Sequence, residues 1–274
     1  MTPELRAAFV ATEIEPLIGV EQAKLTSSDG AAQDDFGWAI ALSGDTALIA
    51  ARSDDIGGNG DQGAVYVFAR NGTMWTEQTK LVASDGAAND YFGSSVALSG
   101  DTALIAAPGV DTGPNVDNGA VYVFARNGTT WTEQTKLVAS DGNTRDFFGW
   151  SVALSDDTAL IGASNVSVTG NNGQGSAYVF VRNGTTWTEQ TKLIASDGAA
   201  GDRFGASVAL SVDTALIGAY NTYAGTNIEL GSAYVFVRNG ATWTEQAELI
   251  ASDRQKGDSF GRSLALSGDT AVIS

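Results

Sequence analysis

The sequence predicts an all-β fold, a β-propeller whose blades are near-identical repeats. Two observations lead to this prediction. A block around a Phe-Gly pair occurs five times, and neighbouring copies are 56 residues apart, which is the signature of a repeat architecture. Within each copy, short apolar runs alternate with tight-turn residues, and no long apolar pattern of helical period is found. The Phe-Gly pairs begin at Phe36, Phe92, Phe148, Phe204 and Phe260.

The first half of each repeat predicts a hairpin, as the second copy illustrates. Residues 95–99 alternate large and small side chains, which suits a crowded strand near a central axis. Gly100-Asp101 follows and has the composition of a two-residue hairpin turn. Residues 102–105 then form the second predicted strand.

The second half of each repeat predicts another hairpin. Residues 120–124 are apolar on both faces, so this third strand must be covered on both sides. Asn127-Gly128 is a second tight turn. The fourth strand, over residues 130–137, is the most polar, and charged residues on an outer strand discourage edge-to-edge pairing. Four antiparallel strands of this kind describe a propeller blade.

We expect one domain, residues 1–274, with five four-stranded blades. The closing blade is expected to combine residues 1–27 with residues 253–274, so that the two ends of the chain share one sheet and leave no free sheet edge. The alternative is an open fragment of a larger propeller. The strands expected in the closing blade are Ser263–Leu266, Thr270–Ile273, Ala7–Ala11 and Val20–Leu25.

Composition excludes several classes of function. The chain has no cysteine and no histidine, which rules out disulfides, thiol nucleophiles, Cys/His zinc sites and histidine-based triads. The formal charge of −17 argues against nucleic acid and anionic lipid as partners. No apolar run is long enough to cross a bilayer, so we expect no membrane insertion. The first residues, Met1–Arg6, do not resemble a secretory signal.

Three segments of the repeat resemble the FG-GAP repeat family, found in the integrin α-chain propeller and in many bacterial surface and secreted proteins. They are Phe92–Ala97, Leu104–Pro108 and Gly119–Phe124. The resemblance implies a propeller of the general WD40-like architecture, a role in binding or adhesion, and an extracellular or cell-surface location. It also implies a calcium loop between strands one and two. The two-residue turn Gly100-Asp101 cannot supply the six to eight oxygens that calcium takes, so this site is not carried over.

Two aspartates recur in the loop that precedes each first strand, and they allow two interpretations. The structural one is turn chemistry, in which the carboxylates accept backbone N–H groups. The functional one is a cation site, with calcium as a weak candidate, at each junction between blades. The aspartates concerned are Asp29, Asp85, Asp141, Asp197 and Asp253, followed by Asp34, Asp90, Asp146, Asp202 and Asp258.

The tryptophans form two groups. Those that begin the fourth strand recur in every complete repeat, which predicts packing between blades; they are Trp75, Trp131, Trp187 and Trp243. Trp38 and Trp150 instead follow the Phe-Gly pair, where the other copies carry Ser94, Ala206 and Arg262. A position that varies in a regular repeat is not set by packing. These five residues should ring one mouth of the channel, and we interpret them as candidate ligand contacts.

The loop between strands two and three also varies in content while its length is kept. It should open on the same face as the loop before strand one, and loops on a rigid scaffold commonly carry binding sites; the alternative is drift of unconstrained polar loops. Tyr220 and Tyr223 are further candidate ligand contacts in this loop. Its copies are residues 52–62, 108–118, 164–174 and 220–230.

Three functions are therefore considered. The first is a non-catalytic module, expected to be monomeric, that binds a glycan or a protein on the face bearing Trp38 and Trp150. The second is a structural repeat scaffold with no ligand of its own. The third, a glycoside-active enzyme, is disfavoured because the prominent carboxylates recur in every repeat, whereas a catalytic pair normally occurs once. No cofactor is expected.

Overall fold

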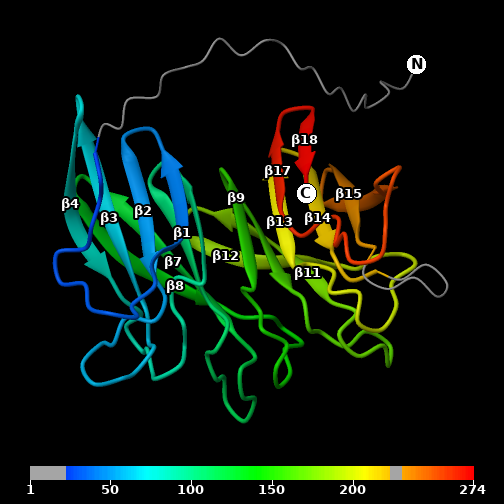
Figure 1. Ribbon diagram of the computed structural model, residues 1–274, viewed down its shortest axis with the longest axis horizontal. Helices are drawn as coiled ribbons and strands as arrows, with labels where there is room; N and C mark the ends of the chain where they lie inside the picture. Colours follow the sequence, from blue (N-terminus) through cyan, green and yellow to red (C-terminus); the bar gives the residue numbers. More distant parts are fainter. Residues whose placement is uncertain (1–22, 223–229) are drawn as a thin grey trace.

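A computed structural model gives the fold of residues 23–222 and 230–274 (Figure 1). Within these residues the chain is all-β, with four antiparallel sheets of four strands and one of two. Strands that are consecutive in sequence are neighbours in each sheet. We call the strand sets β1–β4, β5–β8, β9–β12, β13–β16 and β17–β18 the first to fifth repeats.

The strand bounds follow the 56-residue period. They are β1 Phe36–Ser43, β2 Thr46–Ala51, β3 Ala64–Asn71, β4 Met74–Leu81, β5 Ser95–Ser99, β6 Thr102–Ala107, β7 Ala120–Asn127, β8 Thr130–Leu137, β9 Ser151–Ser155, β10 Thr158–Ala163, β11 Ser176–Asn183, β12 Thr186–Leu193, β13 Ser207–Ser211, β14 Thr214–Ala219, β15 Ser232–Asn239, β16 Thr242–Leu249, β17 Leu264–Ser267 and β18 Thr270–Ile273. The predicted meander of four strands per repeat is thus confirmed for the first four repeats.

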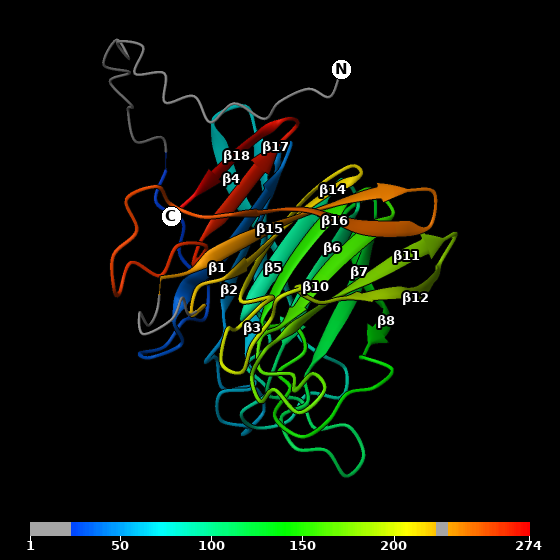
Figure 2. The same cartoon turned by 90° about the vertical axis from the view of Figure 1, so that its right-hand side faces the viewer.

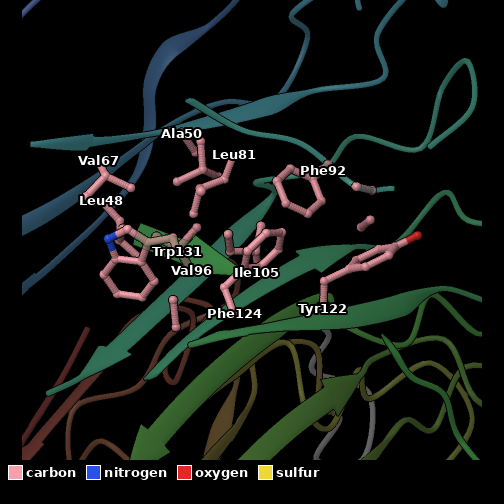
Figure 3. Close-up of a cluster of buried hydrophobic side chains, with 14 of the residues drawn as sticks. Leu48, Ala50, Val67, Leu81, Phe92, Val96, Ile105, Tyr122, Phe124 and Trp131 are labelled. Atoms are coloured by element: carbon pink, nitrogen blue, oxygen red, sulfur yellow. The ribbon is translucent and has the colours of Figure 1, made fainter. Parts of the chain in front are cut away.

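The repeats pack face to face, and the strands that begin successive repeats lie next to one another (Figure 2). One buried cluster joins the first and second repeats: Leu48 and Val67 of the first meet Val96, Phe92 and Trp131 of the second (Figure 3). The same cluster recurs between the second and third repeats and between the third and fourth. Trp131, Trp187 and Trp243 are buried in these clusters, which confirms their predicted packing role between repeats, whereas Trp75 is only partly buried, against the first repeat.

A glycine explains why two motifs recur together. Gly119 has a φ of 86°, and a Cβ placed on it would lie 2.1 Å from the carbonyl oxygen of Phe148. The backbone of the third strand therefore approaches the Phe-Gly pair of the following repeat too closely for any other residue. The amide of Phe148 completes the contact by donating to the carbonyl of Asn118 at 2.8 Å.

Polar contacts repeat across the junctions as well. The two oxygens of Glu133 accept hydrogen bonds from the amide and the hydroxyl of Ser84, each at 2.9 Å. Arg126 on β7 pairs with Asp101 in the β5–β6 turn of the same repeat and reaches back to the hydroxyl of Thr46 in the first repeat at 2.6 Å. Equivalent contacts join the next repeats, so each sheet is fixed in the same position relative to its neighbour.

The two end sheets differ from the interior ones. Ile40 and Leu42 of β1 are each 64% exposed, whereas Val96, which occupies the position of Ile40 in the second repeat, is 9% exposed. At the other end, Val272 of β18 is 65% exposed, whereas Leu48 at the equivalent position is buried. Within the described residues, then, each end of the array presents an apolar sheet face of the kind that is covered at every interior junction.

The expected closing sheet is seen only in part. β17 and β18 match the expected strands Ser263–Leu266 and Thr270–Ile273 to within a residue or so. Ala7–Ala11 lies outside the described residues, and the expected strand Val20–Leu25 is wrong in its described part, since residues 23–25 form no strand. Leu25 packs on the first repeat, while Leu266 packs with the fourth. A strand needs a paired neighbour, and the neighbour expected for Val20–Leu25 is not among the described residues.

Candidate functional site

In the first three repeats, the loop before the first strand and the loop between the second and third strands open on the same side, as predicted, and the loops of the latter kind lie toward the bottom of Figure 1. Together they line an open pocket of about 440 Å³ across the first three repeats. Its apolar lining is aromatic: Trp38 from the first repeat, Tyr91 from the loop before β5, and Phe147 and Trp150 from the third repeat. Ser94, Arg52 and Asp117 supply polar groups.

Trp38 is held in position by the second repeat. Its indole Nε1 donates to the carbonyl oxygen of Ser94 at 3.1 Å. The guanidinium carbon of Arg52 lies 3.1 Å from the centroid of the indole ring, and Arg52 is itself paired with Asp35 at 3.2 Å. One face of Trp38 is therefore covered by a cation, yet the side chain remains 51% exposed.

Trp150 offers a second exposed aromatic surface. Its side chain is 47% exposed and tilts against Phe147, with the ring centroids 6.1 Å apart. Its backbone amide donates to the carbonyl of Phe147 at 3.0 Å, which sets the short turn that places both rings at the pocket. Two aromatic side chains held together in this way form a rigid apolar surface.

Tyr91 and Phe147 were not predicted from the sequence. Both precede the Phe-Gly pair and adopt a left-handed backbone, with φ of 56° and 54°. The same backbone recurs in all five copies although none has glycine there; the other three residues are Asp35, Arg203 and Ser259. A non-glycine residue in this region carries backbone strain. Five different residues occupy this position, so the sequence gives no signal of its left-handed backbone.

The other predicted ligand contacts lie apart from this pocket. Trp38, Ser94 and Trp150 are brought together, whereas Ala206 and Arg262, at the same position in the fourth and fifth repeats, do not line it. Tyr220 is half-buried directly after β14 in the fourth repeat and does not line the pocket either. Tyr223 lies outside the described residues. The expected ring of five equivalent contacts is therefore reduced to a pocket over three repeats.

The second set of recurring aspartates performs turn chemistry. In each copy the Oδ2 atom accepts the backbone amide of the residue three positions earlier, at 2.5–2.7 Å. These carboxylates are mostly buried, and burial raises the pKa of Asp90, Asp146 and Asp202. The structural interpretation is confirmed for Asp34, Asp90, Asp146, Asp202 and Asp258.

The first set of aspartates belongs to a polar cluster at each junction. The tyrosine of the third strand donates its hydroxyl to the Oδ1 atom, as Tyr122 does to Asp85 at 2.7 Å. A lysine of the fourth strand donates to Oδ2 and lies over the tyrosine ring, as Lys136 does at 3.0 Å and 5.2 Å. Burial alone would raise the pKa of Asp85, but the hydrogen bonds from Tyr122 and Lys136 outweigh it and lower that pKa.

This cluster occupies the place where a cation was considered. Asp29, Asp85 and Asp141 each hold a lysine ammonium, those of Lys80, Lys136 and Lys192. Among the residues that the structure describes, no three acidic side chains are grouped so that they could hold a metal ion. Nor is any described helix long and apolar enough to span a membrane.

Comparison with known families agrees with this architecture. The FG-GAP repeat family matches residues 20–68, 75–124, 131–180, 187–236 and 243–274. These segments cover most of the chain, and the protein therefore belongs to the FG-GAP repeat family. The search of curated proteins returned no match.

Proposed function

We propose that this protein is a non-catalytic binding module that holds a glycan in the aromatic pocket of the first three repeats. The observation that carries the proposal is the convergence of Trp38, Tyr91, Phe147 and Trp150 on one pocket, although most repeats carry no aromatic residue after the Phe-Gly pair. A concave apolar site with a few polar groups is the usual form of a small-molecule site, and about 440 Å³ is within its usual size.

The polar groups suit a sugar ring better than a purely apolar ligand. Flat aromatic faces can stack on the apolar face of a pyranose, while hydroxyl groups at the ring edge need donors and acceptors. Arg52 supplies donors, Asp117 supplies acceptors, and Ser94 supplies a hydroxyl. Asp117 is the single carboxylate in the lining, whereas glycoside hydrolysis normally uses two, which supports binding without catalysis.

The test is a glycan array followed by calorimetry on the ligands that bind. Trp150→Ala should reduce affinity at least tenfold, because truncating a central aromatic contact commonly costs about 2 kcal/mol or more. Met74→Ala is the matched control: Met74 is 71% exposed on an outer strand away from the pocket, so its loss should leave affinity unchanged.

Other outcomes separate the alternatives. Binding of an unglycosylated protein that depends on Trp150 would replace a glycan by a protein ligand. The absence of any ligand sensitive to Trp150 would favour the structural scaffold. Turnover of a glycoside, abolished by substitution of Asp117, would make the protein an enzyme. A glycan ligand would also fit the proposed location outside the cell or at its surface, and an adhesive role there as a monomer.

The finer architecture also remains a proposal, namely five sheets closed into a ring. It is supported by the complementary apolar faces at the two ends of the array. Because the chain has no cysteine, cysteine pairs can test it directly. At the first interior junction the amide of Gly100 donates to Ser43, so the pair Ser43→Cys and Ser99→Cys should cross-link with a short bismaleimide. If the ring is closed, the fifth repeat packs on the first as the first packs on the second, so Ser267→Cys and Ser43→Cys should cross-link equally well. An open array predicts no cross-link between these two positions.

A further inference from the structure

The cluster of aspartate, tyrosine and lysine is altered at the junction between the third and fourth repeats. In the three preceding copies the lysine ammonium lies 5.1–5.2 Å from the centroid of the tyrosine ring and 2.7–3.0 Å from an aspartate oxygen. The fourth copy keeps the tyrosine, Tyr234, and the aspartate, Asp197, joined by a hydrogen bond of 3.0 Å. The lysine position, however, is occupied by Glu248.

Glu248 cannot make the contacts that the lysine makes in the sister copies, where the ammonium lies over the tyrosine ring and pairs with the aspartate. Its Oε1 atom accepts a hydrogen bond from Ser232 at 2.7 Å, and Ser232 in turn contacts Thr222 at 3.0 Å. The carboxylate is thus drawn toward these hydroxyls. The face of the Tyr234 ring, which holds an ammonium in each sister copy, has no cationic group among its described contacts.

A second and independent observation points to a missing partner. Asp202 is only 4% exposed, and its Oδ1 atom meets no hydrogen-bond donor within the described residues. Burial raises the pKa of Asp202, and the negative charges of Asp197 and Glu248 raise it further. At the equivalent Asp90, burial also raises the pKa, but there the positive charge of Lys136 opposes that rise. An unpaired, buried carboxylate is costly, and this one lies beside two more negative charges.

We propose that the site formed by Asp197, Asp202, Tyr234 and Glu248 binds a primary ammonium group, supplied by a lysine side chain of a protein partner. The three sister junctions show which group fits the site, since each contains a lysine ammonium between an aromatic face and an aspartate. The acidic side chains are not grouped as metal ligands, which argues against a divalent ion as the occupant. This site is separate from the aromatic pocket and does not depend on it.

The test uses the compound Nα-acetyl-lysine methylamide as the probe and thermal unfolding as the measurement, at constant ionic strength. The probe should raise the Tm of the wild-type protein, because a ligand that binds only the folded state stabilises it. Nα,Nε-diacetyl-lysine methylamide, which lacks the positive charge, should not. Glu248→Lys restores the residue found in the sister repeats, so it should fold, raise the Tm without any ligand, and abolish the response to the probe.

Two further variants make the result specific. Glu248→Gln removes one charge and keeps the shape, and should weaken the response about two- to fivefold in probe concentration, the usual size for an exposed ion pair. Trp150→Ala should leave the response unchanged, which distinguishes this site from the proposed glycan pocket. An undiminished response in Glu248→Lys would overturn the proposal. A response of the wild type to calcium but not to the probe, or to glucosamine alone, would also overturn it.

Discussion

Substitution of Val212 can measure the free-energy cost of the positive φ that the hairpin turn imposes on its first residue. It occupies the first position of the two-residue turn between β13 and β14, where three other copies have glycine and one has Asp156. Its φ is 51°, close to the 55° of Gly100 at the same place in the second repeat. A β-branched residue with positive φ is a genuine outlier, because its branched side chain crowds the backbone.

The expected gain follows from the structure. Holding a residue with a side chain in the left-handed conformation destabilises the folded state by about 1–2 kcal/mol. Replacing it with glycine removes this cost, but glycine loses more conformational freedom on folding, which offsets roughly 0.5–1 kcal/mol of the gain. Val212 is 62% exposed, so little buried apolar area is lost. The backbone amide of Val212 donates a hydrogen bond to the hydroxyl of Ser155 at 3.2 Å, and this contact does not involve the Val212 side chain. Val212→Gly should therefore stabilise the protein by about 1 kcal/mol, and Val212→Asn by a similar amount, since asparagine tolerates this conformation.

The assay is urea unfolding, with the midpoint and slope compared between variants. The matched control is Gly100→Val, which places the same strain in the second repeat. A Cβ at Gly100 would meet no atom within 4 Å, so any loss there comes from the backbone and not from a clash. We expect Gly100→Val to destabilise by about 1 kcal/mol. The reasoning is refuted if Val212→Gly is no more stable than the wild type while Gly100→Val is neutral.

Three further outcomes are expected. Lys136→Met should cost about 0.5–1 kcal/mol at pH 7 through loss of its contacts with Asp85 and Tyr122. The pKa of Asp85 is lowered on folding, so this stabilisation is present above the ordinary value of 3.8 and is lost as the pH falls through the folded value; the difference between the variant and the wild type in urea should shrink at pH 3. Gly119→Ala should destabilise by about 2–3 kcal/mol in the same assay, because its Cβ would meet the backbone of Phe148; equal stability would contradict the close approach. Tyr91→Gly should stabilise the fold by up to about 1 kcal/mol while it weakens glycan binding, and a loss of both would contradict a strained binding residue.

Much of the fold could be predicted because the same strand and turn patterns recur in each copy of the repeat. The predicted strand over residues 95–99 coincides with β5, and the turn residues bound the next strand correctly at Thr102. β7 runs to Asn127, beyond the predicted end at Phe124, because Arg126 is paired with the adjacent hairpin at Asp101. Such a contact spans 25 residues and has no local signature in the sequence.

The candidate site could be predicted only in part, for a similar reason. Trp38 and Trp150 were found because they interrupt a regular pattern, and the structure places both in one pocket. Tyr91 and Phe147 were missed because residues with no common property occupy that position, so nothing in the sequence indicates its left-handed backbone. The lysine–aspartate pair of the junction was missed because its members lie 51 residues apart.

The repeats themselves show where function can reside. A contact present in every copy, such as that of Glu133 with Ser84 and its equivalents, must serve the packing that all junctions share. A function that acts at one place needs a residue that packing leaves free to differ between copies. The aromatic residues around Trp150 and the acidic substitution at Glu248 are departures of this kind, and the second is accompanied by a local cost, an unpaired buried oxygen at Asp202. Because sister copies without this cost exist in the same chain, Glu248→Lys reverses the departure with a residue that the fold already accepts at the equivalent positions.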